Sequence, residues 1–331
     1  MFLPRNQRHT FTPLPSRRNL LSATETDAKA REPTRIKNRC ESMARTIILV
    51  FMSLCEWTDL LDPRPRAEAE ACPISRGANI PLAELPKRMH ELPAKGNVVK
   101  VCDLGVLAGD TVMLLEERGH RCAIVPFEYE YGFQSPQRHS GGDEKALDGV
   151  MWRSVATMPR YRLWEPNSFL MSVVREVRPG DAIDLGCGSG RDAVALADQG
   201  WQVTAVDILP DALDKGKDLL RRYAPASVGK VRWQACDIAL FDAPAESADL
   251  VVCNLFFDPR ATEIAASALR PGGLFVCETF TETHRREHNS PQEKRVVSRE
   301  ALERHPSLTI AHWSEGWSSD RHLARIVARK L

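Results

Sequence analysis

The fold of this chain is decided by the stretch Asp184-Leu185-Gly186-Cys187-Gly188-Ser189-Gly190. A short apolar run leads into this stretch, and a segment with helical period follows it from Arg191. Because glycine has no β-carbon, a turn with three glycines can bend tightly and let its backbone touch a ligand, while the start of the helix offers unpaired amides. The stretch therefore predicts a strand, a ligand-binding turn and a helix.

The same alternation of strand and helix continues after the glycine turn. Short β-branched runs predict strands at about 181–185, 202–206, 230–235, 248–253 and 273–277. Helical period falls between them at 191–199, 210–223 and 260–269, the second helix with Pro210 near its first turn. This order predicts an α/β fold in which helices cover a doubly wound, Rossmann-like parallel sheet.

The second predicted strand ends in Asp207, beside the glycine turn in a parallel sheet. A carboxylate at that place can accept hydrogen bonds from both hydroxyls of a ribose. The fingerprint of nicotinamide-binding proteins needs a glycine three residues after Gly188, where this chain has Arg191. The spacing therefore argues against a dehydrogenase.

Residues 184–190 resemble the first motif of class I S-adenosylmethionine-dependent methyltransferases, and the resemblance extends over about residues 160–331. Later motifs agree with it, including Pro271-Gly272-Gly273 before the fifth strand. The family's fold implies that 308–313 and 324–329 form the last two strands, one of them antiparallel. The resemblance implies S-adenosyl-L-methionine as cofactor, bound by Asp184, Gly186, Cys187, Gly188, Gly190, Asp207, Ile208, Asp237, Ile238 and Asn254. For Asp237 a helix N-cap is the alternative.

Four segments look most like the tellurite-resistance and thiol or thiopurine methyltransferase branch of that family. They are Arg162–Asn167, Gly190–Asp192, Phe256–Arg260 and Glu278–Phe280. Members of this branch methylate small soft nucleophiles such as thiols. The thiolate itself attacks the methyl group, so the positioning of the two reactants supplies most of the rate. The resemblance thus implies methyl transfer to a small soluble acceptor, such as a thiol or another chalcogen nucleophile.

An oxygen or nitrogen acceptor would instead need a base, and Asp258, Glu278 and His284 follow strand ends on the cofactor side. Trp164 and Phe257 are candidates for the walls of the acceptor pocket. Each has a structural alternative: Asp258 as a helix cap, Glu278 as the partner of an arginine, His284 as a solvated loop residue, and the aromatic rings as core.

A second pattern occupies residues 47–129 and resembles a rhodanese-like domain, a smaller α/β unit. The resemblance rests on Asp62-Pro63-Arg64, on Asn79-Ile80-Pro81-Leu82 and on Cys102, with helices expected at 66–71, 82–92 and 109–118. It implies that Cys102 is the catalytic cysteine that carries a persulfide. The alternative function is therefore a rhodanese-type sulfurtransferase whose C-terminal domain senses the methyl donor.

Length and composition limit the partners. A chain of 331 residues suits two domains, here 47–129 and 161–331, with a linker at 130–160. The formal net charge of +1 favours a small-molecule acceptor and gives no reason to expect nucleic acid or a membrane. The nine cysteines contain no C-x-x-C pair, so neither a disulfide framework nor a metal site is indicated. Nothing in the sequence indicates the oligomeric state.

The first residues differ from the rest of the chain. Arg5, Arg8, Arg17 and Arg18 occur among serines and threonines before the first acid, Glu25. Residues 1–46 are therefore a disordered extension or a targeting segment. The expected location is the cytoplasm, with a mitochondrion or another organelle as the alternative if 1–42 are a transit peptide.

Overall fold

The computed structural model describes residues 56–130, 161–291 and 295–331. The chain divides between Leu49 and Val50 into two units, and every described residue belongs to the second unit. The extension expected at 1–46 and the linker expected at 130–160, apart from Glu130, lie outside the described residues. The domain boundaries proposed from the sequence therefore remain predictions.

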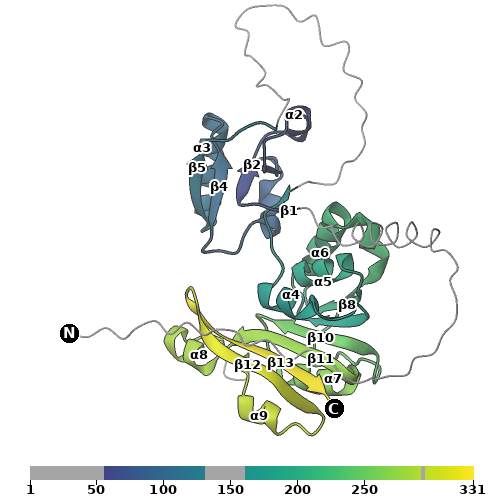
Figure 1. The fold of residues 1–331 in the computed structure, drawn as a ribbon. Helices are drawn as coiled ribbons and strands as arrows, with labels where there is room; N and C mark the ends of the chain where they lie inside the picture. The colour runs from purple at the N-terminus through teal and green to yellow at the C-terminus, as the bar shows by residue number, and fades with distance from the viewer. Residues whose placement is uncertain (1–55, 131–160, 292–294) are drawn as a thin grey trace, which may run out of the picture. The chain divides into compact units, whose positions relative to one another are not determined.

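A seven-stranded sheet organises the C-terminal part of the chain (Figure 1). In spatial order the strands are β12 (Leu308–Ser318), β13 (Arg321–Lys330), β11 (Leu269–Phe280), β10 (Ala248–Asn254), β7 (Asp181–Leu185), β8 (Gln202–Asp207) and β9 (Val231–Ala235). Neighbouring strands are parallel except that β13 is antiparallel to both β11 and β12. The predicted doubly wound sheet with one antiparallel strand is confirmed.

Helices cover both faces of this sheet, because successive residues of a strand point to opposite sides. Ala182 of β7 packs with one set of helices and its neighbour Ile183 with another. The first set is α4 (Ser168–Val174), α5 (Arg191–Asp198) and α6 (Pro210–Tyr223), and the second is α7 (Pro259–Ala268) with α9 (Arg299–Glu303). This two-sided burial explains why apolar residues predominate on both faces of the central strands.

The order of the strands reverses at β7. From β7 the chain proceeds to β8 and β9 on one side, whereas β10 and β11 lie on the other side. In open α/β sheets, ligands bind outside the carboxyl ends of the strands at such a reversal. The glycine turn at 186–190 follows β7 at this point.

A smaller sheet contains four parallel strands in the order β3 (Ala78–Asn79), β2 (Leu60–Asp62), β4 (Val98–Cys102) and β5 (Arg121–Val125). Its helices are α2 (Arg66–Ala71) and α3 (Val106–Glu117). Val99, Val101 and Leu115 form part of its core, with no exposed surface. Separately, β1 (Glu56–Trp57) pairs in parallel with β6 (Tyr161–Arg162).

The helix predicted at 82–92 is wrong. Two short 3-10 turns, η1 (Leu85–Lys87) and η2 (Met89–Glu91), stand in its place. Pro86 lies inside the segment, and a proline there removes a backbone donor and clashes with the preceding turn of an α-helix. The sequence also missed three short helices, α4, α8 (Glu282–His288) and α9.

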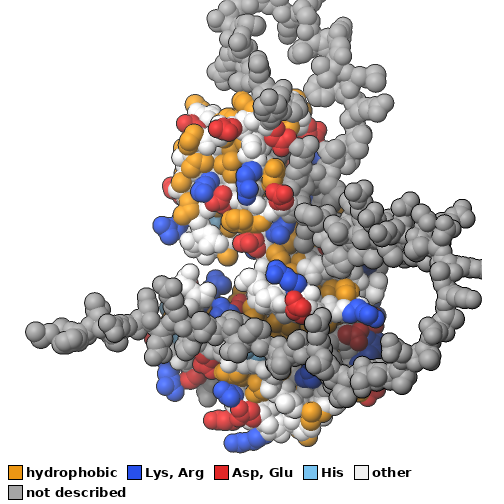
Figure 2. Space-filling view, in the orientation of Figure 1, with side chains coloured by type: hydrophobic (Ala, Val, Ile, Leu, Met, Phe, Trp, Pro, Cys, Tyr) orange, Lys and Arg blue, Asp and Glu red, His pale blue; other side chains and the backbone are white. Residues whose placement is uncertain are grey.

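The surface carries charges of both signs. On the face that Figure 2 shows, the Lys and Arg side chains of the described residues are interspersed with those of Asp and Glu. This mixture agrees with the near-zero net charge of the sequence. Among the described residues, no helix is both long enough and apolar enough to span a lipid bilayer.

Candidate active site

The turn between β7 and α5, here called the glycine hinge (residues 186–190), is held against strand β8. The backbone amides of Gly186 and Cys187 both donate to the carbonyl oxygen of Val206, at 2.8 and 3.0 Å. Gly186, Gly188 and Gly190 have φ angles of 69°, 54° and 72°, a range that glycine adopts without steric cost. The alternate glycines therefore allow the tight reversal that the sequence predicts.

The carboxylate of Asp207 lies beside the glycine hinge. Its Oδ2 accepts a hydrogen bond from the amide of Gly188 at 2.8 Å, and its Oδ1 accepts one from the amide of Leu209 at 2.9 Å. Each carboxylate oxygen has a second lone pair for another donor. The next residue, Ile208, has 60% of its surface exposed. This end of β8 thus combines two available acceptor positions with an exposed apolar side chain.

The space around the three glycines differs. A β-carbon at Gly186 would lie 2.6 Å from the ring of Phe256, and one at Gly190 or Gly216 would lie 2.5 Å from the ring of Trp233. A β-carbon at Gly188 would meet no heavy atom within 4 Å. Gly186 and Gly190 are thus required for packing, whereas Gly188 leaves backbone that a ligand can approach.

Negative charge is concentrated next to the glycine hinge. Asp184 is 2% exposed, and its Oδ2 has no hydrogen-bond partner among the described residues. Burial, followed by the charges of Asp192 and Asp207, raises the pKa of Asp184. Burial and the charges of Asp184 and Asp207 likewise raise the pKa of the Cys187 thiol. A cation bound at this point would offset the charge of these acids.

A chain of hydrogen bonds crosses the carboxyl ends of β10 and β11. Asn167 donates from its backbone amide to Asp192 at 2.7 Å and from its side chain to Glu278 at 2.8 Å. Asn254 donates to Asp192 at 2.9 Å, and its Oδ1 accepts from the amide of Glu278 at 3.0 Å. The sequence analysis did not select Asn167 and Asp192 as site residues, although both stand in segments that carried the resemblance. This network fixes α4, α5 and the two strand ends relative to one another.

The two residues expected at the adenine edge, Asp237 and Ile238, lie in different environments. Asp237 is exposed, and its Oδ1 accepts a hydrogen bond from the amide of Ala239 at 3.0 Å, which is a local turn contact. Ile238 is only 6% exposed and packs in the core against α7. The side chain of Ile238 therefore faces the core, and the expected contact of this residue with the cofactor stays a prediction that would involve its backbone.

The three candidate bases are already engaged. Asp258 caps α7 by accepting from the amide of Arg260 at 3.0 Å, and Glu278 is bound by Arg325 at 2.6 Å. Nδ1 of His284 accepts from the amide of His322 at 3.3 Å, so the proton of the neutral ring belongs on Nε2. His284 is 8% exposed on α8, and so it is not the solvated loop residue considered above.

The two aromatic residues expected to line the acceptor pocket are core residues. Trp164 has no exposed surface and packs edge-to-face on Tyr223 at 5.5 Å between ring centroids, and Phe257 is 6% exposed in the core beside α7. Their place in the acceptor pocket stays a prediction, and the burial of both rings favours the alternative that they belong to the core. Of the two adjacent phenylalanines, the one whose ring lies against the glycine hinge is Phe256, which is only partly buried. Two adjacent phenylalanines left this choice open in the sequence.

Cys102 stands at the carboxyl end of β4, one turn before α3. The side chain has no exposed surface. Burial, followed by the charge of Asp62, raises the pKa of the Cys102 thiol to about 12, against a lowering effect of Arg64. A thiol in this state is poorly suited to nucleophilic attack.

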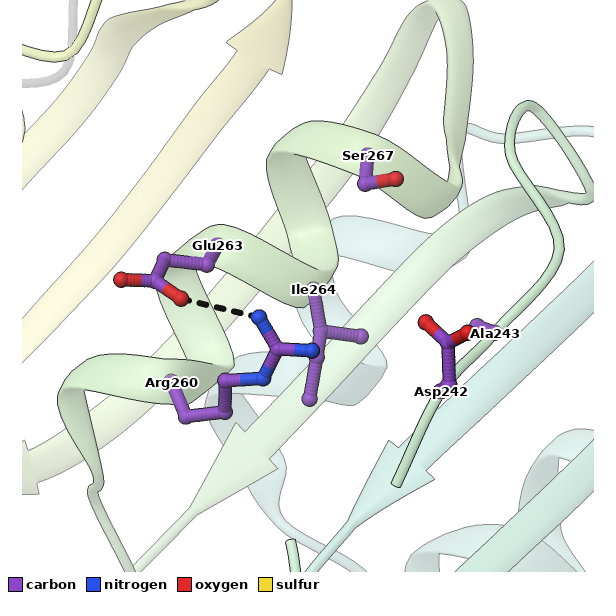
Figure 3. A pocket seen from close by; sticks show the side chains of 6 residues that line it. All are labelled: Asp242, Ala243, Arg260, Glu263, Ile264 and Ser267. Carbon is purple, nitrogen blue, oxygen red and sulfur yellow. Dashed lines mark hydrogen bonds and ion pairs between the residues drawn. The ribbon is translucent and has the colours of Figure 1, made fainter. Parts of the chain in front are cut away.

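A hollow of about 190 Å³ lies beside α7 (Figure 3). It is lined by Asp242, Ala243, Arg260, Glu263, Ile264 and Ser267. Arg260 donates to Glu263 at 2.9 Å, as the dashed line shows. None of the predicted cofactor-binding residues lines this hollow, so it is not part of the candidate site.

Comparison with known proteins identifies the part of the chain around the glycine hinge. Residues 182–273 match a family model described as a methyltransferase domain. The chain carries a methyltransferase domain. This domain is of the class I type, which uses S-adenosylmethionine, as the motifs at 184–190 and Asp207 predicted. The match to the family model extends from β7 to the start of β11 and therefore includes the whole glycine hinge.

Individual relatives of this methyltransferase domain differ in their acceptors. The chain is 35% identical over 104 residues to the ubiquinone biosynthesis O-methyltransferase of Idiomarina loihiensis, covering 30% of this chain and 41% of that protein. It is 33% identical over 107 residues to the ribosomal RNA small subunit methyltransferase C of Alcanivorax borkumensis, covering 29% and 31%. Because the chain spans less than half the length of these relatives, their acceptors do not transfer to it.

Solved structures resemble the domain more distantly. The N-methyltransferase NodS from Bradyrhizobium japonicum is 20% identical, with a TM-score of 0.40 over 49% of this chain and 92% of that chain. A likeness at this level adds nothing to the assignment.

Proposed function

We propose that this chain transfers a methyl group from S-adenosylmethionine to a small soluble acceptor. The observation that carries the proposal is the hydrogen bond between the carboxylate of Asp207 and the amide of Gly188, at 2.8 Å. It joins the acid of one strand to the open backbone of the glycine hinge, next to the exposed Ile208. This combination fits an adenosyl group, with Asp207 accepting from the ribose hydroxyls.

The acids behind the glycine hinge fit the positive charge of the same donor. When bound, S-adenosylmethionine supplies an electrophilic methyl group on a sulfonium. Asp184 has a buried carboxylate oxygen without a partner among the described residues, and its pKa is raised by burial and by two neighbouring acids. A nearby cation favours the ionised form of such a group. We therefore assign Asp184 to electrostatic stabilisation of the donor.

We further propose that the acceptor is a thiol or another chalcogen nucleophile, as in the branch that the sequence resembles. The supporting observation is that Asp258, Glu278 and His284 are all engaged in structural hydrogen bonds. A soft nucleophile that attacks as an anion needs no base, so its methylation depends on orientation and on exclusion of water.

The sulfurtransferase alternative lacks a comparable observation. Cys102 has no exposed surface, and its thiol pKa is raised to about 12. A persulfide carrier needs an accessible sulfur with a stabilised thiolate. We therefore do not propose sulfur transfer as the activity of this chain.

The decisive experiment is a calorimetric titration of the full chain with S-adenosylmethionine, with NAD as the control ligand. We expect saturable binding of the first and none of the second. The same preparation is then incubated with radiolabelled donor and with matched thiol, phenol and amine acceptors. Absence of donor binding would refute the proposed function, and label transfer to phenols or amines but never to thiols would refute the chalcogen assignment alone.

A further inference from the structure

Arg295 lies one aromatic ring away from the glycine hinge. The carbon at the centre of its guanidinium group is 4.6 Å from the centroid of the Phe256 ring. The same ring also lies against the hinge, since a β-carbon at Gly186 would be 2.6 Å from it. Phe256 follows β10, the strand next to β7 in the sheet. Arg295 is therefore placed on the side where an acceptor must approach the donor.

The guanidinium group of Arg295 is incompletely paired within the described residues. Its Nη1 is buried and has no hydrogen-bond partner there. Among the described residues it pairs with Asp258, whose Oδ2 is 3.7 Å from Nη1, beyond hydrogen-bond distance. Oδ1 of Asp258 is already used to cap α7. A partly buried guanidinium group with an unused donor is costly. Because Nη1 itself has no accessible surface, an external acceptor would approach the part of the side chain that remains exposed.

Other arginines of the same domain behave differently. Each of the following donates to a carboxylate at 2.9 Å or less: Arg260, Arg285, Arg299 and Arg325. The side chain of Arg295 nevertheless retains 33% of its accessible surface. Arg295 is thus about as exposed as Arg260 and Arg325, at 38% and 34%, and differs from them in having no carboxylate within hydrogen-bond distance among the described residues.

The shape and charge of the guanidinium group and its surroundings indicate which kind of ligand Arg295 would bind. A guanidinium group is planar and presents parallel N–H donors, which match the two oxygens of a carboxylate. Asp258 at 3.7 Å largely offsets the positive charge of Arg295. A site with so little net positive charge favours a singly charged anion over a phosphate dianion.

We infer that Arg295 binds a carboxylate group carried by the methyl acceptor. This inference rests on the proposed function and narrows its substrate class to small carboxylic acids. Arg295 orients the acceptor from the end opposite to the nucleophile, while the stacked ring of Phe256 keeps the guanidinium group beside the glycine hinge.

The test measures binding as well as turnover. The full chain is saturated with S-adenosylhomocysteine and titrated with two matched pairs, benzoate with benzamide and mercaptoacetate with mercaptoacetamide. Wild-type protein is compared with Arg295→Gln and Arg295→Lys. The control is Arg299→Gln, which removes the same charge four residues away, where the arginine is bound to Glu303 at 2.7 Å.

We expect wild-type protein to bind each carboxylate about tenfold or more tightly than its amide, as a charge-assisted hydrogen bond would provide. Arg295→Gln should abolish this preference with an unchanged melting temperature, Arg295→Lys should keep part of it, and Arg299→Gln should keep all of it. Equal binding of acid and amide by wild-type protein, or a preference that survives in Arg295→Gln, would overturn the inference. If S-adenosylhomocysteine fails to bind, the proposed function fails. Titration of the unliganded protein then still shows whether Arg295 binds a carboxylate.

Discussion

Two strand–turn–helix units in this chain have the same local design and different environments. In the first, β4 ends in Cys102 and leads into α3, and in the second, β7 leads through the glycine hinge into α5. Cys102 has no exposed surface, whereas Gly188 leaves its backbone open beside the carboxylate of Asp207. The backbone of the first turn is open as well, since a β-carbon at Gly105 would meet no heavy atom within 4 Å. The two units therefore differ in the strand that follows the helix, which ends in Val125 in the first unit and in Asp207 in the second.

The largest effect is expected from Gly190→Ala, which tests whether the glycine hinge is sterically required. The new β-carbon would lie 2.5 Å from Trp233, and φ at this position is 72°. Backbone strain and overpacking together should lower the free energy of unfolding by about 3–5 kcal/mol, measured by denaturant titration.

Gly188→Ala is the matched control, because φ there is 54° but nothing lies within 4 Å of the new β-carbon. It should lower the free energy of unfolding by only about 1–2 kcal/mol, from backbone strain alone. Equal losses for the two variants would contradict the steric role of Trp233.

Asp207→Ala tests the carboxylate at the end of β8, where the corresponding strand of the first unit ends in Val125. Loss of a carboxylate that accepts from the donor's ribose should weaken S-adenosylmethionine binding by about 10–100-fold in calorimetry. Asp211→Ala removes an exposed acid from the first turn of α6 and should leave the affinity unchanged. An unaltered affinity in Asp207→Ala would exclude this carboxylate from the donor site.

The pH dependence of donor binding tests the buried acids. Because the pKa of Asp184 is raised, this group is still protonated above the usual titration range of an aspartate. Its ionisation as pH rises supplies the charge that attracts a sulfonium, so the donor affinity should increase with pH, by at most about tenfold per unit. The same ionisation should reduce the stability of the free protein as pH rises through the raised pKa. Asp184→Asn should remove both dependences, and a pH-independent affinity in wild-type protein would contradict the assignment.

The smallest effect is expected from Cys102→Ala, which tests the buried thiol of the first unit. Methyl transfer should change by less than about twofold, since this thiol does not belong to the donor site. With a pKa of about 12, only about one thiol in ten thousand is ionised at pH 8, so native Cys102 should resist iodoacetamide while the partly exposed Cys236 reacts. Rapid labelling of Cys102 in the folded protein would show that this thiol is accessible and reactive, and would contradict the prediction.

The donor side of the site was predictable from the sequence because its determinants are local. The spacing of Gly186, Gly188 and Gly190 sets a turn, and Asp207 ends the next strand, so a parallel sheet necessarily brings them together. The bounds of β7 followed for the same reason, whereas β11, β12 and β13 extend three to five residues beyond their predicted ranges.

The acceptor side was not predictable to the same degree. The residues that we propose there, Phe256 and Arg295, are brought together by tertiary packing, as are the hydrogen bonds that join α4, α5 and β10 nearby. Nothing local distinguishes Phe256, which lies against the hinge, from Phe257, which enters the core. Glu278 appeared to be a candidate base because its partner Arg325 is 47 residues away in the sequence.

The indole of Trp233 occupies the space that side chains at both Gly190 and Gly216 would need. The three positions, on three different elements, therefore form one steric unit in which a gain of volume at either glycine requires a loss at the tryptophan. Homologous chains should accordingly exchange these residues together, and a paired substitution such as Gly216→Ala with Trp233→Leu should be tolerated better than Gly216→Ala alone.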